Sequence, residues 1–165
     1  MTRAASDQEA KTGDGAAMLA GGCQCGAVRY ALTMTPQNVH YCHCRMCQKA
    51  VGNIFATLAP VKKTALRWVK GTPAFYESSN VAERGFCPAC GTPLTFAYKS
   101  SEWTAVTLGS LDDPAGVPPE RHYGIESHVP WLSIDDDLPR ARTDDSPSPY
   151  LKSLVIHQHP DRSDT

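Results

Sequence analysis

The sequence predicts a mainly β domain of short strands with little helix. Among its 165 residues are 13 prolines and 12 glycines, which favour many turns over long helices. Several short stretches alternate apolar and polar residues with the period of a half-buried strand. Seven cysteines fall into close groups, and a domain of this size with many turns gains stability from bound metal. We therefore expect antiparallel sheets of short strands that zinc ions hold together.

Composition divides the chain into three parts. Residues 1–17 are polar and lack periodicity, so we expect a flexible N-terminal segment. Residues 18–140 contain every cysteine and every predicted strand, and we expect them to form one zinc-binding domain. Residues 141–165 include the Ser-, Pro- and Asp-rich run 143–149, which is typical of a disordered tail. The pattern of residues 150–156 leaves open whether a small element docks there.

Short apolar and alternating stretches predict the first elements. Along residues 28–32, Val, Tyr and Leu alternate with Arg and Ala, as on a half-buried strand. The helix that we expect next has room for two turns before Gly52 and Asn53 end it. An apolar strand follows, and Pro60 is expected to end it. In order, we expect strands at 28–32 and 39–42, a helix over 44–51, a strand at 54–58, and another that begins at Leu66 and Trp68.

The second half of the domain continues with strands between turns. Leu94, Phe96 and Tyr98 alternate along one stretch, and a second alternating stretch follows after residues 99–101. These two stretches predict a hairpin, and a long loop follows it. We expect strands at 74–77, 81–86, 94–98, 103–108, 121–123 and 127–134.

Charge and apolar content exclude two classes of partner. The formal net charge is −1, which argues against nucleic acid as the main partner. The apolar run 16–20 is too short for a signal sequence, and no stretch is long enough to span a membrane. We therefore expect a cytoplasmic protein. Thiols stay reduced in that compartment, and seven is an odd number for a set of disulfides, so the cysteines are predicted to be metal ligands.

The segment Cys87-Pro88-Ala89-Cys90-Gly91 has the form of a zinc knuckle. Two residues between the cysteines make a tight turn whose backbone N–H groups can point at the sulfur atoms. A redox role for this spacing would need the cysteines at the start of a helix in a βαβ unit. Here Pro93 and a predicted strand follow instead. We therefore favour structural zinc at this knuckle.

Cys23 and Cys25 are expected to complete that site. On a strand, their spacing places both side chains on one face. Together with Cys87 and Cys90 they make a closed set of four thiolates that joins two distant parts of the chain. The alternative is a pair of buried, inert thiols. The glycines that flank the pair and the matching pair downstream favour the metal site.

Cys42, Cys44 and Cys47 place three thiols within six residues. Three protein ligands leave one zinc position open, and an open position distinguishes a catalytic zinc from a structural one. We expect such an open site. The alternatives are a closed site completed by His40 or His43, and a nucleophilic cysteine that acts without metal. In an extended segment His43 points away from Cys42 and Cys44, whereas His40 shares the face of Cys42.

These residues resemble the glutathione-dependent formaldehyde-activating enzyme family, which includes the centromere protein V-like domains. The resemblance covers about residues 18–139, with weaker matches at 108–114 and 130–132, and its seven-cysteine pattern is highly specific. The tail after Arg140 lies outside it. The matching stretches are Gly22-Cys23-Gln24-Cys25-Gly26 with Val28-Arg29-Tyr30, Cys42-His43-Cys44-Arg45-Met46-Cys47-Gln48-Lys49, and Arg84-Gly85-Phe86-Cys87-Pro88-Ala89-Cys90-Gly91-Thr92-Pro93-Leu94.

The resemblance implies a fold of coiled β-sheets with two zinc ions per chain. It also implies the family's named activity, the condensation of glutathione with formaldehyde to S-hydroxymethylglutathione, which is classed as a carbon–sulfur lyase reaction. The expected partners are a small thiol such as glutathione and a small aldehyde. The resemblance assigns a structural zinc to Cys23, Cys25, Cys87 and Cys90, and a second zinc to the expected catalytic residues Cys42, Cys44 and Cys47.

The expected chemistry of the open site is thiol activation. Zinc there can bind a thiol and lower its pKa, which produces a thiolate nucleophile near neutral pH. Three thiolate ligands donate much charge, so the metal is a poor Lewis acid and polarises an aldehyde weakly. Other readings are a module that binds zinc or thiol without turnover, and a protein-interaction domain. Candidate cations for the carboxylates of glutathione, each of which could instead be a solvated surface charge, are Arg45, Lys49, Arg84 and His128.

Overall fold

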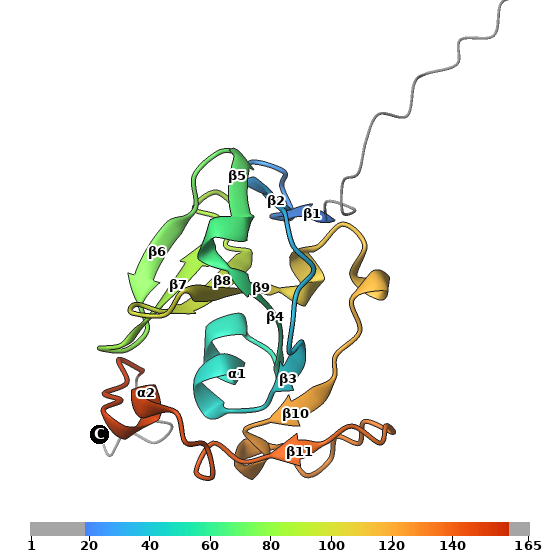
Figure 1. Cartoon of the computed structure of the whole chain (residues 1–165), viewed down its shortest axis with the longest axis vertical. Coiled ribbons are helices and arrows are strands. Elements are labelled where there is room, and N and C mark those ends of the chain that lie inside the picture. Colours follow the sequence, from blue (N-terminus) through green and yellow to red (C-terminus); the bar gives the residue numbers. More distant parts are fainter. Residues whose placement is uncertain (1–18, 159–165) are drawn as a thin grey trace, which may run out of the picture.

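The computed structural model describes residues 19–158, and the expected flexible segment 1–17 lies outside this range. The described chain folds into two sheets with two short α-helices, which confirms the mainly β prediction. Neither of these helices is long and apolar enough to cross a membrane. The smaller sheet is antiparallel and lies at one end of the molecule (Figure 1). Its order is β1 (Leu19–Gly22), β2 (Arg29–Leu32), β5 (Leu66–Lys70).

The larger sheet has eight strands in the order β11-β10-β3-β4-β9-β8-β7-β6. The pairs from β3 to β6 are antiparallel, as predicted. At the other edge β10 pairs in parallel with both β3 and β11. A parallel neighbour needs a long connection, and the whole hairpin region lies between β3 and β10 in the sequence. The strands are β3 (His40–Cys42), β4 (Ala56–Lys62), β6 (Ala74–Glu77), β7 (Ala82–Phe86), β8 (Pro93–Tyr98), β9 (Trp103–Thr107), β10 (Arg121–Tyr123) and β11 (Arg140–Ala141).

The larger sheet carries a separate apolar core on each face. Successive residues of a strand point to opposite faces. Ala59 and Val106, which pair across β4 and β9, belong to the first core. Their neighbours Leu58 and Ala105 belong to the second core. The first core also contains two cysteines of the predicted group of four, and the second contains all three of the other group. Each cysteine group therefore lies against its own face of one sheet.

Helix α1 (Arg45–Val51) lies beside the second core and ends where the sequence predicts. Gly52 follows it with a φ of 64°, and the Gly52 N–H donates to the carbonyl of Gln48. Only glycine adopts this left-handed conformation without strain, so the helix stops there. The buried side-chain amide of Gln48 donates to the carbonyl oxygens of His43 and Ser127 at 2.7 and 2.8 Å. Gln48 thereby fixes the loop before the helix.

Two expected strand features are wrong. Strand β4 continues through Pro60 to Lys62. The carbonyl of Pro60 accepts a hydrogen bond from the Gln37 N–H at 2.9 Å, on the edge away from β9, so the missing proline N–H costs no bond in the ladder to β9. Residues 127–134 form no strand. The turn η4 (Ile125–Ser127) leads into Pro130, which has no N–H for a ladder.

The chain after β11 lies along the side of the molecule that carries α1 and reaches the ends of β6 and β7 (Figure 1). It contains the short helix α2 (Pro149–Lys152). Within α2, the ring of Tyr150 stacks on Tyr98 of β8 with centroids 4.2 Å apart. The side chain of Asn80 bonds the backbone of Ser153 and of Val155, at 2.7 Å in both cases. Residues 150–156, which the sequence left open, therefore dock on the large sheet.

The remaining elements are single 3-10 turns. Two of them shape the loop that the sequence predicts between β9 and β10. The turns are η1 (Lys63–Ala65), η2 (Leu108–Ser110) and η3 (Pro114–Gly116).

Candidate metal centres

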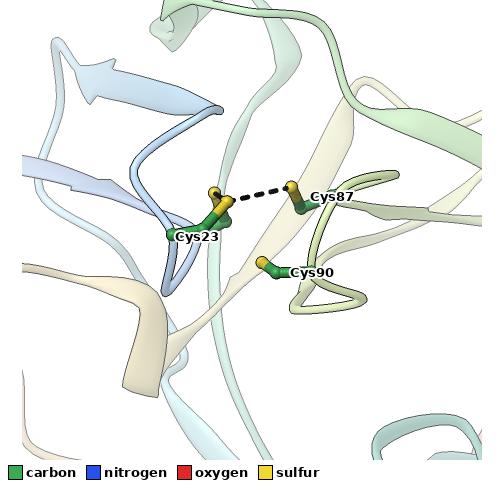
Figure 2. A group of neighbouring side chains, drawn as sticks. Cys23, Cys87 and Cys90 are labelled. Atoms are coloured by element: carbon green, nitrogen blue, oxygen red, sulfur yellow. Dashed lines mark hydrogen bonds between the residues drawn. The ribbon is translucent and has the colours of Figure 1, made fainter.

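Four cysteines from two distant turns meet at the first centre. Cys23 and Cys25 lie in the loop after β1, and Cys87 and Cys90 lie in the turn after β7. Figure 2 shows Cys23 facing Cys87 and Cys90 across a small gap. All four sulfur atoms lie within 4.8 Å of one another. The structure thus brings together the predicted group of four, although a turn rather than a strand aligns Cys23 with Cys25.

Thr92 connects the two halves of this centre. Its Oγ1 atom accepts a hydrogen bond from the Gln24 N–H at 3.1 Å and lies 3.1 Å from the Sγ atom of Cys90. Hydrogen bonds from the side chain and backbone of Thr92, with further bonds from Cys25, lower the pKa of Cys90 from 9.0 to about 6. On the other side, the Val28 N–H donates to the sulfur of Cys23 at 3.2 Å. Donors aimed at sulfur favour the thiolate, which is the form that binds metal.

Three buried cysteines form the second centre around the start of α1. Cys42 ends β3, Cys44 precedes the helix, and Cys47 lies in its first turn. Their sulfur atoms lie within 4.8 Å of one another. Gly124 packs against this group with a φ of 71°, and a Cβ atom there would lie 2.7 Å from the backbone nitrogen of Cys44. Only glycine fits at that approach.

Arg84 brings a positive charge to the second centre. Its guanidinium is buried, lies 4.8 Å from the centroid of the Phe96 ring, and donates through Nη2 to the sulfur of Cys47 at 3.4 Å. Hydrogen bonds from Cys42 and Cys44, together with the charge of Arg84, hold the pKa of Cys47 well below its usual value. The contact with Arg84 thus favours the thiolate form of Cys47. The Nε atom of Arg84 is buried and has no hydrogen-bond partner.

Neither histidine that could close the second centre joins its sulfur atoms. Among residues 19–158, the group within 4.8 Å contains only the three cysteines. The Nδ1 atom of His40 lies 2.7 Å from the carbonyl oxygen of Asn38. The ring of His43 lies in a separate cluster, stacked on His122 with centroids 5.1 Å apart and tilted against His128 at 4.9 Å.

His43 belongs to a buried hydrogen-bonded chain that the sequence does not reveal. Its Nε2 atom lies 2.8 Å from Nδ1 of His122, and Nε2 of His122 lies 3.0 Å from both carboxylate oxygens of Asp136. The carboxylate accepts, so His122 carries a proton on Nε2, and a single proton joins its Nδ1 atom to Nε2 of His43. Burial first, and then the neighbouring His122 and His128, lower the pKa of His43 to about 4. His43 is therefore neutral at pH 7.

A pocket of about 350 Å³ opens beside the second centre. The three cysteines, His40 and Arg84 all face it. Volumes of this size are typical of sites for small molecules. Of the four cations expected to bind carboxylates, only Arg84 lines this pocket. Lys49 borders a separate pocket of about 270 Å³ together with Arg84, and Arg45 donates to the side chain of Gln48 at 2.9 Å.

The spacing of the sulfur atoms fits a tetrahedral ion. With zinc–sulfur bonds of ~2.3 Å, two ligands in a tetrahedral site lie about 3.8 Å apart. The closest contacts are 3.5 Å between Cys23 and Cys25, 3.9 Å between Cys25 and Cys87, and 3.4 Å between Cys42 and Cys44. Both groups could therefore hold a metal ion with small adjustments. Donor sets made only of cysteine suit soft ions, among them Zn²⁺.

The arrangement of seven cysteines agrees with a comparison against known families. The sequence model described as "Glutathione-dependent formaldehyde-activating enzyme" matches residues 18–127. The chain belongs to this family. The match includes both cysteine groups and Arg84, and it ends before the segment that docks on Tyr98.

Two proteins with curated names are similar to the chain. A Schizosaccharomyces pombe protein described as an uncharacterized lyase is 30% identical over 82 residues, which are 50% of this chain and 59% of the relative. A Halomonas elongata protein with the provisional name glutathione-dependent formaldehyde-activating enzyme is 27% identical over 128 residues, 72% of this chain and 82% of that protein. A Rhodobacter sphaeroides protein of known crystal structure is 27% identical to this chain. The alignment covers 61% of this chain and 91% of that protein, with a TM-score of 0.49.

Proposed function

We propose that the chain is a zinc-dependent carbon–sulfur lyase that forms and cleaves the adduct of a thiol with a small aldehyde, such as S-hydroxymethylglutathione. Cys23, Cys25, Cys87 and Cys90 would hold a structural zinc. Cys42, Cys44 and Cys47 would hold a second zinc and form the catalytic site. Family membership and the lyase names of the relatives support the reaction class. The proposal places the protein in the cytoplasm, where thiols stay reduced.

The observation that carries this proposal is the pocket beside three buried sulfur atoms. Bound there, zinc would supply an exchangeable position at which a thiol loses its proton more easily. The chain surrounds that position with the thiolate of Cys47 and the guanidinium of Arg84. No described histidine or carboxylate lies among the three sulfur atoms to complete a closed set. The four-cysteine group, in contrast, has a full set of four ligands. A structural zinc there would need no pocket, because no position is left open for a substrate.

The residues of this chain have separate tasks in the proposed reaction. The thiol sulfur adds to the carbonyl carbon, the carbon–oxygen double bond becomes a single bond, and the thiol proton ends on the oxygen. The reverse reaction breaks the carbon–sulfur bond. The guanidinium of Arg84, which lines the pocket, would donate to the oxygen as it gains charge. The series of hydrogen bonds from Asp136 through His122 to His43 would hold the loop that carries Cys42 and Cys44.

Turnover tests this proposal against a module that only binds thiol or zinc. Full-length protein with a measured zinc content would be mixed with glutathione and ¹³C-formaldehyde, and exchange between free and adduct carbon would be followed by NMR. We expect exchange faster than in buffer, and its loss in Cys47→Ser. The exposed Ser133→Ala variant is the control. Glutathione binding without faster exchange would favour the binding module. If glutathione neither bound nor exchanged faster, a protein-interaction domain would be favoured.

A further inference from the structure

The pocket beside the second centre has mainly apolar walls. Strands β4, β8 and β9 supply one wall, and residues after the family match supply another. Leu151 and Leu154 face this space and are half-buried, whereas Lys152 and Ser153 between them are exposed. The apolar lining residues include Phe96, Tyr98, Trp103, Leu151 and Leu154.

The C-terminal wall is fixed at both of its ends. Glu126 accepts a hydrogen bond from the Thr143 N–H at 3.1 Å, where the segment begins to line the pocket. Farther along, Tyr150 stacks on Tyr98, and Asn80 holds the backbone on both sides of Leu154. Leu151 and Leu154 are therefore held facing the cavity. A wall in a fixed position can discriminate ligands by size and shape.

The charged side chains that line the pocket within the described chain are cations. Arg84, Arg121 and His40 line it, and no Asp or Glu is among the lining residues within the described chain. Arg121 already donates to the side chain of Asn38 at 2.7 Å. The ammonium group of glutathione would therefore find no carboxylate inside. The guanidinium of Arg84 offers a donor for one oxygen acceptor close to Cys47, and the mainly apolar lining of the pocket suits an apolar ligand.

We infer that this pocket receives the carbonyl substrate, and that this substrate is an aldehyde with an apolar chain of several carbons rather than formaldehyde alone. The inference rests on the proposed function and specifies its substrate class. The aldehyde oxygen lies toward Arg84 and its chain lies between Phe96 and Leu151. The thiol adds to the carbonyl carbon, and its proton moves to the oxygen. No oxidant or reductant is needed. Formaldehyde has no carbon chain that could contact the wall formed by the C-terminal segment.

A series of aldehydes tests the inference on the full-length, zinc-loaded protein. Adduct formation with glutathione would be measured for formaldehyde, acetaldehyde, butanal and hexanal. One buried methylene in an apolar pocket changes kcat/KM by about 10-fold or more. We therefore expect kcat/KM to rise at least 10-fold from formaldehyde to butanal. Binding of the unreactive alcohols 1-hexanol and methanol, followed by calorimetry, gives a readout that does not depend on turnover, and we expect only 1-hexanol to bind.

Two variants locate the selectivity in the C-terminal wall. Leu151→Asp puts a charge on the wall and should weaken 1-hexanol binding at least 10-fold. Leu151→Ala provides a milder change if the first variant folds poorly. Val155→Asp is the matched control, because the Val155 side chain is 61% exposed and it follows Leu154 in the same segment. Hexanol binding and the aldehyde preference should be unchanged in this control.

The outcomes separate the inference from the proposed function. Turnover of formaldehyde with no gain for longer aldehydes and no binding of 1-hexanol would overturn the inference and leave the proposed function standing. Failure to turn over any aldehyde would overturn the proposed function. If 1-hexanol still bound in that case, and bound less tightly to Leu151→Asp, the apolar character of the ligand would be supported.

Discussion

The Nε2 atom of His43 lies 2.8 Å from the Nδ1 atom of His122, although 79 residues separate the two in sequence. Both rings are fully buried and stacked. His43 stands between two cysteines of the second centre, so its ring attaches that loop to strand β10. A backbone hydrogen bond makes the same connection, because the His43 N–H donates to the carbonyl of Tyr123 at 2.7 Å. The position of the cysteines therefore depends on residues that touch no sulfur atom.

The carboxylate of Asp136, which bonds His122, should contribute measurably to the free energy of unfolding. Asp136→Ala leaves the buried Nε2–H of His122 without a partner, and an unsatisfied buried donor costs about 1–3 kcal/mol. Urea unfolding of the zinc-loaded protein would measure the loss. The neighbouring exposed Asp137→Ala should change the free energy of unfolding by less than about 0.5 kcal/mol. Equal effects of the two substitutions would show that the hydrogen bond between Asp136 and His122 does not stabilise the fold.

Stability should fall as the pH drops below neutrality because of His43. Its pKa is about 4 in the folded protein and 6.5 in an ordinary environment. Between these values the unfolded chain binds a proton that the folded protein excludes. The contribution of neutral His43 is therefore complete above pH 6.5 and is lost toward pH 4, with a limiting slope of about 1.4 kcal/mol per pH unit.

Urea unfolding at several pH values would measure this slope. Zinc content in the same samples would restrict the comparison to pH values at which occupancy stays constant. His43→Gln should flatten the profile, because it removes the titrating ring. An unchanged slope in that variant would assign the pH dependence to other groups.

The first centre should be required for folding. Structural zinc contributes ~10 kcal/mol or more, which is comparable to the entire stability of a small domain. Cys87 is fully buried, and Cys87→Ser should give insoluble or unfolded protein. Cys47→Ser should stay folded with about one zinc fewer. Circular dichroism, thermal melting and metal analysis would compare the variants. A soluble Cys87→Ser protein with a normal melting transition would refute the assignment.

The second centre should lose its metal first. Three protein ligands with an exchangeable fourth position hold zinc less firmly than a closed set of four. Mild chelation should therefore remove about one zinc per chain while the fold is retained, and glutathione should alter that rate. Metal content and circular dichroism would be followed together. If both ions leave as the protein unfolds, or glutathione has no effect, the open-site mechanism fails and His40 becomes the first candidate for a fourth ligand.

Local patterns predict the elements that local chemistry determines. Strands β6 and β10 have the predicted bounds, and α1 ends at Gly52 because that residue alone adopts its left-handed backbone without strain. The structure also forms the two cysteine groups that the spacing predicts. Pro60 misleads, because whether a proline ends a strand depends on which edge its missing N–H faces. The sequence does not show which edge that is.

The features that sequence reasoning misses are all long-range. His122 and Asp136 lie in stretches with no motif, and their link to His43 exists only after β10 pairs with β3. Arg84 is predicted only as a contact for a carboxylate, whereas the structure places its Nη2 on the sulfur of Cys47, 37 residues away. The docking of Tyr150 on Tyr98 has no local signal either, because a run rich in Ser and Pro precedes it.

The first centre sets an order of events for a newly made chain. Cys25 and Cys87 lie 62 residues apart, so the four-cysteine set cannot close until the ribosome has released the turn at Cys90. The three cysteines around α1 are local and emerge earlier. Early in synthesis, the three-cysteine group is therefore complete while the four-cysteine group is not, so the second centre can bind zinc before the first one can form.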